Sequence, residues 1–491
     1  MEVGNIVDMV KNFDLIVLGG GSGLNVASVA AQRGLKVAVI EPGPLGGTCL
    51  NRGCIPSKMV IEAGEVAQTI RHSPTFGIQG EVKSVDFAKI MESTMGFVDE
   101  EARGIEEAIK SHPQYTLYKH FARFTGPKKL SIGNEEIEAE KIVIAAGTRP
   151  FIPPIPGLDK TVYHTSDSIF RLKELPKSMI FIGGGYISCE LAYFFGALGS
   201  QVTVLDRGTS LLSNEDGQIA QTFTKVFGQN YGVVLEANIK EVAGPPPGQA
   251  GAVAVKYTVG KEDKEQTVTA DLLLVATGRV ANSDSLQLKE AGYKLSERGF
   301  IEVNEFMETS VAGVWALGDI VGKAPFKHGA NYEAKIVSQN IFAEKDQKVA
   351  ANYTVMPHAV YSYPQVAGVG LMEEQAQKME IDYVLGVYPY MRTGMGRALH
   401  DEDGFMKVLA DRKTRRIIGA HIIGTDASIL IHELVVVMAA AGGDVEAVKN
   451  TIHIHPSLSE VVARAVNSIS WEGKAPNYGK TLMERTTEQK I

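Results

Sequence analysis

Two of the three cysteines in the chain, Cys49 and Cys54, lie only five residues apart. In a regular helix, residues at that spacing have Cα atoms about 8–9 Å apart, whereas a disulfide requires about 7 Å or less. The segment must be distorted if the cysteines pair, and Gly53 permits such a distortion at low steric cost. Pro56 suits the first turn of a following helix. A strained, accessible disulfide is readily reduced; the alternative is that both thiols stay reduced and pack as small hydrophobic side chains.

A second candidate for chemistry is segment 452–460, which contains His455 and ends in Glu460. Histidine is the side chain best suited to moving protons near neutral pH, and a carboxylate on its other ring nitrogen would orient it. The pattern therefore predicts a general acid or base at His455 that Glu460 holds in place. On residue types alone, simple packing of His453 and His455 stays open as the alternative.

These residues need elements to position them, and the first is a dinucleotide-binding unit near the start of the chain. An apolar strand over 13–18 runs into a glycine-rich turn and a helix over 24–33. Such a turn presents backbone N–H groups and a helix N-terminus to a pyrophosphate. The next strand ends in Glu41, about 20 residues after the glycines, where a ribose hydroxyl would be bound. The glycines expected at the phosphates are Gly19, Gly21 and Gly23.

A second unit of the same kind follows an apolar strand over 179–182. Its phosphate turn contains Gly183 and Gly185, and two such units in one chain imply two bound dinucleotides. The strand after its helix ends in Asp206, an acid that would bind ribose hydroxyls and repel a 2′-phosphate. Arg207 would instead favour NADP. The charges at this site favour NAD, and NADP stays open.

The cysteine segment 46–58 resembles the redox-active segment of the flavoprotein disulfide reductases, the family of lipoamide dehydrogenase, glutathione reductase, mycothione reductase and mercuric reductase. The resemblance extends over almost the whole chain through segments 145–150, 272–279, 313–319 and 452–460. It implies FAD in the first unit and a nicotinamide in the second. It also implies that electrons pass between these cofactors, a Cys49–Cys54 disulfide and a small dithiol or disulfide substrate.

Individual roles follow from the same resemblance. Cys54 would lie nearer the flavin, and Cys49 would exchange with the substrate. His455 and Glu460 would act in the active site of the partner subunit, so the resemblance implies a homodimer with shared active sites. The remaining cofactor contacts are assigned to Gly47, Thr48, Lys58, Gly147, Tyr186, Glu190, Gly278, Arg279, Gly318 and Asp319, with Lys58 paired to Glu190.

The expected fold is α/β, with two Rossmann-like dinucleotide-binding domains and a C-terminal α+β dimerisation domain. A proline-rich stretch after Pro150 indicates a rigid linker between domains. The predicted division is an FAD-binding domain at 1–155, an NAD(P)-binding domain at 156–280, a central segment completing the FAD site at 281–350, a dimerisation domain at 351–475 and a polar tail at 476–491.

The composition of the chain limits its partners. Its 491 residues, 44% of them hydrophobic, are enough for several globular domains. A formal net charge of −8 without a long basic run argues against nucleic-acid binding. No apolar run reaches the roughly 18 residues of a spanning helix, and residues 1–12 lack a signal-peptide pattern. A cytoplasmic protein without membrane contact is expected, and no metal site is predicted.

The sequence predicts the type of reaction but leaves several substrates open. Segment 452–460 and Asp206 resemble dihydrolipoyl dehydrogenases most, which predicts a dihydrolipoamide substrate, including one on a lipoyl domain. The alternative is NAD(P)H-dependent reduction of a low-molecular-weight thiol disulfide, as in mycothione reductases. Glutathione is disfavoured because Val29 replaces an arginine of glutathione reductases, although Lys335 matches another and leaves an acidic thiol open. Mercuric ion is disfavoured because no cysteine follows Cys189. The alternative to an enzyme is a non-catalytic flavin-binding component of a larger complex, in which both cysteines are inert.

Overall fold

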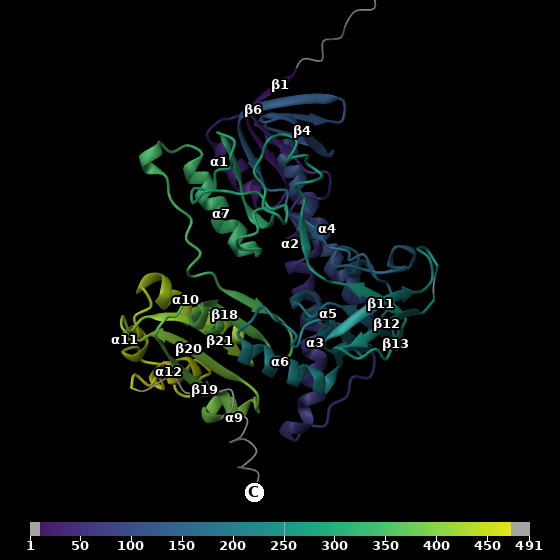
Figure 1. Ribbon diagram of the computed structural model, residues 1–491, viewed down its shortest axis with the longest axis vertical. Helices are drawn as coiled ribbons and strands as arrows, with labels where there is room; N and C mark the ends of the chain where they lie inside the picture. Colours follow the sequence, from purple (N-terminus) through teal and green to yellow (C-terminus); the bar gives the residue numbers. More distant parts are fainter. Residues whose placement is uncertain (1–9, 250, 473–491) are drawn as a thin grey trace, which may run out of the picture.

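The computed structural model describes residues 10–249 and 251–472, and its elements form a mixed α/β fold. Figure 1 shows three groups of elements: a first nucleotide-binding fold around β1 and β6, a second beside α5 and β11, and a C-terminal group around β18 to β21. The predicted α/β fold class is confirmed. The predicted polar tail at 476–491 lies outside the described residues.

Four parallel strands form the centre of the first fold in the order β3-β2-β1-β6. Helix α1 connects β1 to β2, and its apolar face packs on them through Val26, Ala27 and Ala30. The last four residues of β1 and all of β2 are buried, as in parallel strands covered on both faces. The bounds are β1 Lys11–Leu18, α1 Gly23–Gln32, β2 Val37–Ile40, β3 Tyr115–Tyr118 and β6 Glu135–Ile144.

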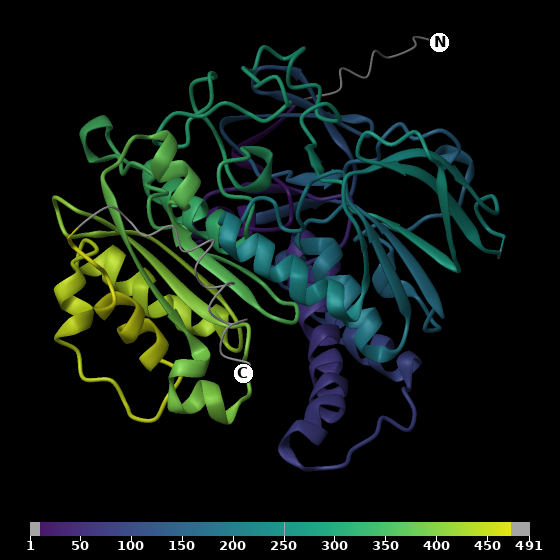
Figure 2. The ribbon, with the colours of Figure 1, turned by 60° about the horizontal axis from the view of Figure 1, so that its bottom comes forward.

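A long helical excursion separates β2 from β3. It contains α2 (Gly47–Arg52), α3 (Cys54–His72), a short 3₁₀ turn (Ser73–Phe76) and α4 (Phe87–Ser111). Helix α3 extends well away from the sheet, and Figure 2 shows it as the long purple helix. Two antiparallel strands, β4 (Ala122–Gly126) and β5 (Lys129–Ile132), then lead into β6.

The chain leaves the first fold and returns to it through two adjacent strands. β7 (Thr148–Pro150) pairs antiparallel with β15 (Arg279–Ala281), so the exit and the re-entry lie side by side. The proline-rich stretch follows β7 directly, with no helix or strand over 151–157.

The second fold is a four-stranded parallel sheet in the order β10-β9-β8-β14. Helix α5 is buried along most of its length, and Phe194 and Phe195 pack against Phe87 of α4. An antiparallel sheet of β11, β12 and β13 covers the parallel one. The bounds are β8 Ser178–Ile182, α5 Tyr186–Leu198, β9 Gln201–Leu205, α6 Gly217–Asn230, β10 Gly232–Val234, β11 Ala237–Ala243, β12 Val253–Val259, β13 Gln266–Ala270 and β14 Leu272–Val275.

The segment after β15 rejoins the first fold. Strand β16 (Val314–Ala316) pairs in parallel with β6, and a 3₁₀ turn over Gly318–Ile320 follows it. Helix α7 (Lys327–Asn340) then packs against α1, as Figure 1 shows. The first sheet is therefore built from two parts of the chain that the second fold separates.

The C-terminal group is a five-stranded antiparallel sheet in the order β17-β18-β21-β20-β19. One face packs against α10, α11 and α12. The other carries Val366, Phe405 and Ile423 against the aromatic core around α5 and α6. The bounds are β17 His358–Val360, β18 Val366–Gly370, α8 Glu373–Lys378, β19 Tyr383–Pro389, α9 Gly394–Ala398, β20 Phe405–Asp411, β21 Ile417–Ile423, α10 Ala427–Ala440, α11 Val445–Lys449 and α12 Glu460–Asn467.

Among the helices in the described ranges, none combines the length and the apolar character that crossing a membrane requires.

Candidate active site

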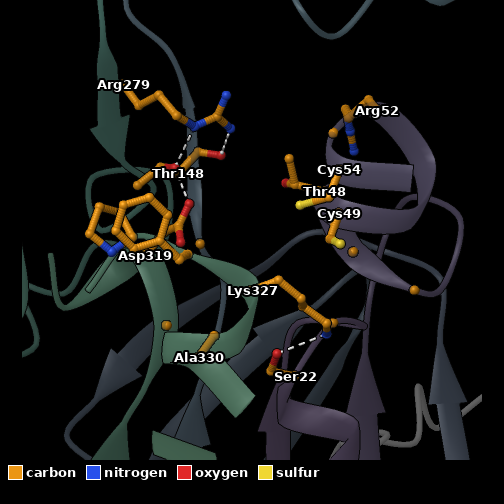
Figure 3. Close-up of a pocket in the computed structure, with 18 of the residues that line it drawn as sticks. Ser22, Thr48, Cys49, Arg52, Cys54, Thr148, Arg279, Asp319, Lys327 and Ala330 are labelled. Atoms are coloured by element: carbon orange, nitrogen blue, oxygen red, sulfur yellow. Dashed lines mark hydrogen bonds between the residues drawn. The ribbon is translucent and has the colours of Figure 1, made fainter. Parts of the chain in front are cut away.

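A cavity of about 2050 Å³ opens between the first fold, α3, α5 and the start of the C-terminal group. Both cysteines face it from α2 and α3, opposite α7 and the strands that link the two folds (Figure 3). The predicted site residues that line the cavity are Gly19, Gly21, Glu41, Gly47, Thr48, Cys49, Cys54, Lys58, Gly147, Tyr186, Glu190, Arg279, Gly318 and Asp319.

Other predicted site residues lie outside this cavity. Those of the second phosphate turn and its strand belong to the second fold, and the histidine and its acid lie in the C-terminal group. The predicted residues not among the lining residues are Gly23, Gly183, Gly185, Asp206, Arg207, Gly278, His455 and Glu460.

The first glycine turn forms a cradle that side chains would fill. Gly19 has φ +110°, and a Cβ there would collide with the carbonyl oxygen of Ala145. A Cβ on Gly47 would lie 2.8 Å from Cα of Gly21, so the two glycine-containing loops touch. The Glu41 carboxylate accepts the backbone N–H of Gly20 at 2.8 Å. Bare backbone beside a helix N-terminus, with an acid at the end of the next strand, fits the pyrophosphate and ribose of FAD.

The cysteines lie on either side of a break between two helices. Helix α2 ends at Arg52 and α3 begins at Cys54, with Gly53 between them at φ −138° and ψ −121°. A Cβ on Gly53 would lie 2.9 Å from the carbonyl oxygen of Thr48. The helix is thus distorted at Gly53, as pairing of the cysteines would require. Both cysteines are free thiols here, with Cys49 half-buried and Cys54 exposed.

The two thiols differ in acidity. A hydrogen bond from Cys49, helped by the positive charge of Lys58, lowers the pKa of Cys54 to about 7. The same hydrogen bond, together with burial, raises the pKa of Cys49 well above its ordinary value. The negative charge of the reduced pair is therefore favoured on Cys54. A thiolate is the reactive form of cysteine in exchange reactions.

The predicted Lys58–Glu190 pair is present. Lys58 Nζ lies 2.7 Å from both carboxylate oxygens of Glu190, and Glu190 is only 4% exposed. The backbone N–H of Tyr361 donates to the same carboxylate at 3.0 Å. Lys58 Nζ also lies 4.5 Å from the centre of the Tyr361 ring. The pair therefore joins α3, α5 and the C-terminal group beside Cys54.

A hydrogen-bonded chain connects the far wall of the cavity. Thr148 Oγ1 donates to Asp319 Oδ2 at 3.0 Å and accepts from Arg279 Nε at 2.8 Å. Figure 3 shows these three side chains opposite the cysteines. They come from β7, β15 and the turn after β16, so the wall depends on the exit and return of the chain.

The second phosphate turn repeats the design of the first. Gly183 has φ +106°, and a Cβ there would lie 2.5 Å from the carbonyl oxygen of Ala276. The carboxylate of Asp206 accepts the backbone N–H of Gly184 at 2.6 Å and that of Gly208 at 2.7 Å. Arg207 is exposed. The acid at the end of β9 is therefore held as Glu41 is held at the end of β2, which fits a second dinucleotide.

The predicted histidine and its acid are in contact. His455 Nδ1 lies 3.1 Å from Glu460 Oε1, and this hydrogen bond lowers the pKa of Glu460 below its ordinary value. The His455 side chain is 76% exposed. Since His455 does not line the described cavity of its own chain, a single chain does not bring it to the cysteines.

Exposed apolar side chains lie beside this histidine in the chain and on α10, which His453 contacts through Glu433. Ile452 is 97% exposed and Ile454 is 77% exposed, on either side of His453. Ile429 and Val436 of α10 are also more than 60% exposed. Exposed large hydrophobic side chains that gather on one part of a protein mark an interaction surface.

Lys327 and Ser22 are among the residues that line the cavity but were not predicted as site residues. Lys327 is the first residue of α7, and its Nζ donates to Ser22 Oγ at 2.9 Å. A lysine at the positive end of a helix dipole is unfavourable. This unfavourable position is the feature of the sequence that could have marked Lys327 as a site residue. The predicted cation Lys335 is exposed on the same helix and does not line the cavity.

The fold and the site together define a flavin- and nicotinamide-dependent disulfide oxidoreductase. Residues 13–338 match the pyridine nucleotide-disulphide oxidoreductase family, and residues 356–466 match its dimerisation domain. The chain belongs to this family, whose members use FAD and NAD(P)H. The predicted family, its cofactors and the three-part domain architecture are confirmed.

Curated relatives match along nearly their full length. The chain is 36% identical to mycothione reductase of Mycobacterium tuberculosis over 467 residues, which cover 93% of this chain and 99% of the relative. It is 35% identical to dihydrolipoyl dehydrogenase of Geobacillus stearothermophilus, over 93% of this chain and 96% of the relative. Among solved structures, the HOCl-induced flavoprotein disulfide reductase RclA from Escherichia coli, in its Cu(II) complex, has a TM-score of 0.81 and 27% identity, over 93% of this chain and 99% of RclA.

Proposed function

We propose that this chain is an NAD-dependent dihydrolipoyl dehydrogenase. The observation that carries the proposal is the carboxylate of Asp206, held at the end of β9 by the N–H groups of Gly184 and Gly208. A carboxylate at this place binds ribose hydroxyls and repels a 2′-phosphate. By resemblance, glutathione reductase-like members bind NADPH with a second arginine, and the uncharged Ser213 stands at that position here.

The cysteines would carry the exchange with substrate. FAD, when bound, supplies the chemistry that couples the nicotinamide to the cysteine pair. Cys49 attacks or releases the substrate sulfur, and Cys54 holds the negative charge that its lowered pKa favours. His455 of the partner subunit moves the proton to or from the substrate thiol, and Glu460 orients that imidazole through Nδ1.

This mechanism requires a homodimer with shared active sites. The exposed apolar residues around His455 would be covered by the second subunit, and the match to a dimerisation domain supports this arrangement. The lipoyl group would reach Cys49 where the cavity opens, either free or on a lipoyl domain.

The direct test is NADH formation from NAD and dihydrolipoamide by the purified flavoprotein, with NADP in a parallel reaction. Fast turnover with NAD that the Cys49→Ser variant loses supports the proposal. An Asp206→Ala variant should raise the KM for NAD about tenfold, since one charge-assisted contact is lost. Equal rates with NADP would contradict the role of Asp206.

The second candidate is reduction of a low-molecular-weight thiol disulfide. The similarity to mycothione reductase over nearly its full length favours it. Rapid disulfide-dependent oxidation of a reduced nicotinamide, with little dihydrolipoamide turnover, would select it. If treating the oxidised protein with NADH does not produce two titratable thiols, the cysteines are inert and both candidate functions are wrong.

A further inference from the structure

Glu333 of α7 is a carboxylic acid that the fold encloses completely, with 0% of its surface exposed. Burial raises its pKa to about 7, although two hydrogen bonds and the charge of Lys323 act in the opposite direction. Burying an ionisable acid is unfavourable compared with burying an apolar side chain of similar size. Packing alone therefore does not explain an acid at this position. Glu333 does not line the cavity, so a bound cofactor would not touch it.

Each oxygen of this carboxylate accepts a hydrogen bond. Oε2 accepts the backbone N–H of Gly318 at 2.5 Å, and Oε1 accepts the hydroxyl of Tyr353 at 2.7 Å. Gly318 is buried and begins the 3₁₀ turn after β16, with φ +76°, a conformation that favours glycine. The bond from its N–H therefore fixes the start of this turn to α7.

The turn that Glu333 holds brings Asp319 to the cavity. Asp319 lines the cavity, and its Oδ2 accepts the hydroxyl of Thr148 at 3.0 Å. Figure 3 shows the Asp319 carboxylate beside Thr148, in the wall opposite the cysteines. Gly318 and Asp319 are adjacent residues, so a bond that fixes the backbone of the first limits the positions that the side chain of the second can take.

The second oxygen of Glu333 connects the same turn to the start of the C-terminal group. Tyr353 lies in segment 351–357, which leads into β17. Tyr332 of α7 also holds this segment, because its hydroxyl accepts the backbone N–H of Asn352 at 2.8 Å. Glu333 thus joins the turn of Asp319 and the segment before β17 to one helix.

We propose that Glu333 is a positioning residue for FAD, which holds the turn at Gly318 so that Asp319 meets the cofactor in a fixed place. The inference goes beyond the proposed function, because it does not depend on which disulfide or dithiol is the substrate. It rests on the expected contact of Asp319 with FAD. Without the carboxylate, the buried N–H of Gly318 loses its acceptor, and a buried donor without a partner favours rearrangement of the turn.

The rate at which the diluted holoenzyme releases FAD, followed by the rise in flavin fluorescence, tests this proposal without any turnover. Glu333→Ala should raise the rate about tenfold, as expected for loss of one hydrogen bond to a charged group. Glu333→Gln should raise it less than about threefold. Its amide oxygen can accept the N–H of Gly318, and its amide nitrogen can donate to the hydroxyl of Tyr353.

Asn340→Ala is the matched control for general loss of stability. Asn340 is also buried on α7, and its side chain bonds backbone groups that do not line the cavity. This variant should lower the urea midpoint as Glu333→Ala does, but it should change the rate of FAD release less than about twofold. Equal acceleration of FAD release by Asn340→Ala and Glu333→Ala would overturn the proposal.

A double-variant cycle decides whether Glu333 acts through Asp319. Asp319→Ala alone should speed release of FAD, and adding Glu333→Ala to it should speed release no more than about twofold further. If Glu333→Ala does not fold, Glu333→Asp takes its place with the same expectation, because its shorter side chain withdraws the carboxylate from Gly318. Effects that multiply in the double variant, or an unchanged rate in either single variant, would overturn the proposal.

Discussion

The acidity of Cys54 depends on which neighbouring side chain carries a charge. Its pKa of about 7 rests first on the hydrogen bond from Cys49 and then on the charge of Lys58, while Glu190 acts in the opposite direction. Near pH 8 the reduced pair should therefore hold a thiolate at Cys54, and near pH 6 it should be protonated. Reactivity toward electrophiles follows the thiolate.

Replacing Lys58 should make Cys54 less acidic. In Lys58→Met the lowering charge is lost and Glu190 remains, so the pH midpoint for alkylation of Cys54 by iodoacetamide should rise above about 7, toward that of an ordinary thiol. The Lys58→Met, Glu190→Gln double variant removes both charges and should show a smaller rise. An unchanged midpoint in Lys58→Met would mean that Lys58 does not act on Cys54.

At the scale of elements, the break between α2 and α3 brings the cysteines together. Gly53 lies within contact distance of the backbone of the preceding helix, so any side chain there must displace it. The local geometry of the cysteine pair therefore depends on the absence of a Cβ atom at Gly53.

Gly53→Ala should lower the free energy of unfolding by about 1–2 kcal/mol, because the new Cβ would lie 2.9 Å from Thr48 O. It should also slow exchange at Cys49. Urea unfolding of the reduced protein measures the first effect and alkylation the second. The matched control is Gly96→Ala in α4, where a Cβ has no atom within 4 Å; it should stabilise the protein by about 0.4–1 kcal/mol. Equal effects of the two substitutions would show that Gly53 is not sterically special.

At the scale of the whole molecule, a buried ion cluster joins the second fold to the C-terminal group. Lys407 of β20 is 2% exposed, and its Nζ lies 2.9 Å from Asp216 at the start of α6 and 2.5 Å from Glu373. Asp216 also accepts the N–H of Gln218 and so caps α6. Burial opposes ionisation of Asp216, yet neighbouring positive charge keeps its pKa below the ordinary value.

Lys407→Met should lower the free energy of unfolding by about 3–5 kcal/mol at pH 7, since it leaves Asp216 buried and charged. The Lys407→Met, Asp216→Asn double variant should lose less. Because the folded pKa of Asp216 is depressed, its contribution is present above the unfolded pKa and is lost as the pH falls through the folded pKa. Urea unfolding at pH 7 and near pH 3 measures both effects. A double variant as unstable as the sum of its single variants would contradict the pairing.

The proposed sharing of the active site between two subunits also belongs to the scale of the whole molecule. Co-expression of Cys49→Ser and His455→Gln chains gives hybrid dimers in which one site combines an intact cysteine pair with an intact histidine. Since random pairing makes about half of the dimers hybrid, activity should recover to roughly a quarter of wild type, although each variant alone is nearly inactive. No recovery in isolated hybrid dimers would place Cys49 and His455 of one chain in the same site.

The sequence by itself determined the features that depend on neighbouring residues. The glycine turns, the strand-terminal acids Glu41 and Asp206 and the break at Gly53 follow from local spacing, because the backbone geometry of a turn or a helix end is decided within a few residues. The family was also recognisable, since its motifs are short and continuous.

Only the tertiary structure decided which distant side chains meet. Lys327 and Ser22 are 305 residues apart in the chain and touch because α7 packs on α1. Lys335, which left an acidic thiol substrate open in the sequence, lies about two helical turns later on α7 and does not line the cavity. His455 meets Glu460 locally but lies outside the cavity of its own chain. Such contacts depend on how whole elements pack, and no local pattern of residues records that packing.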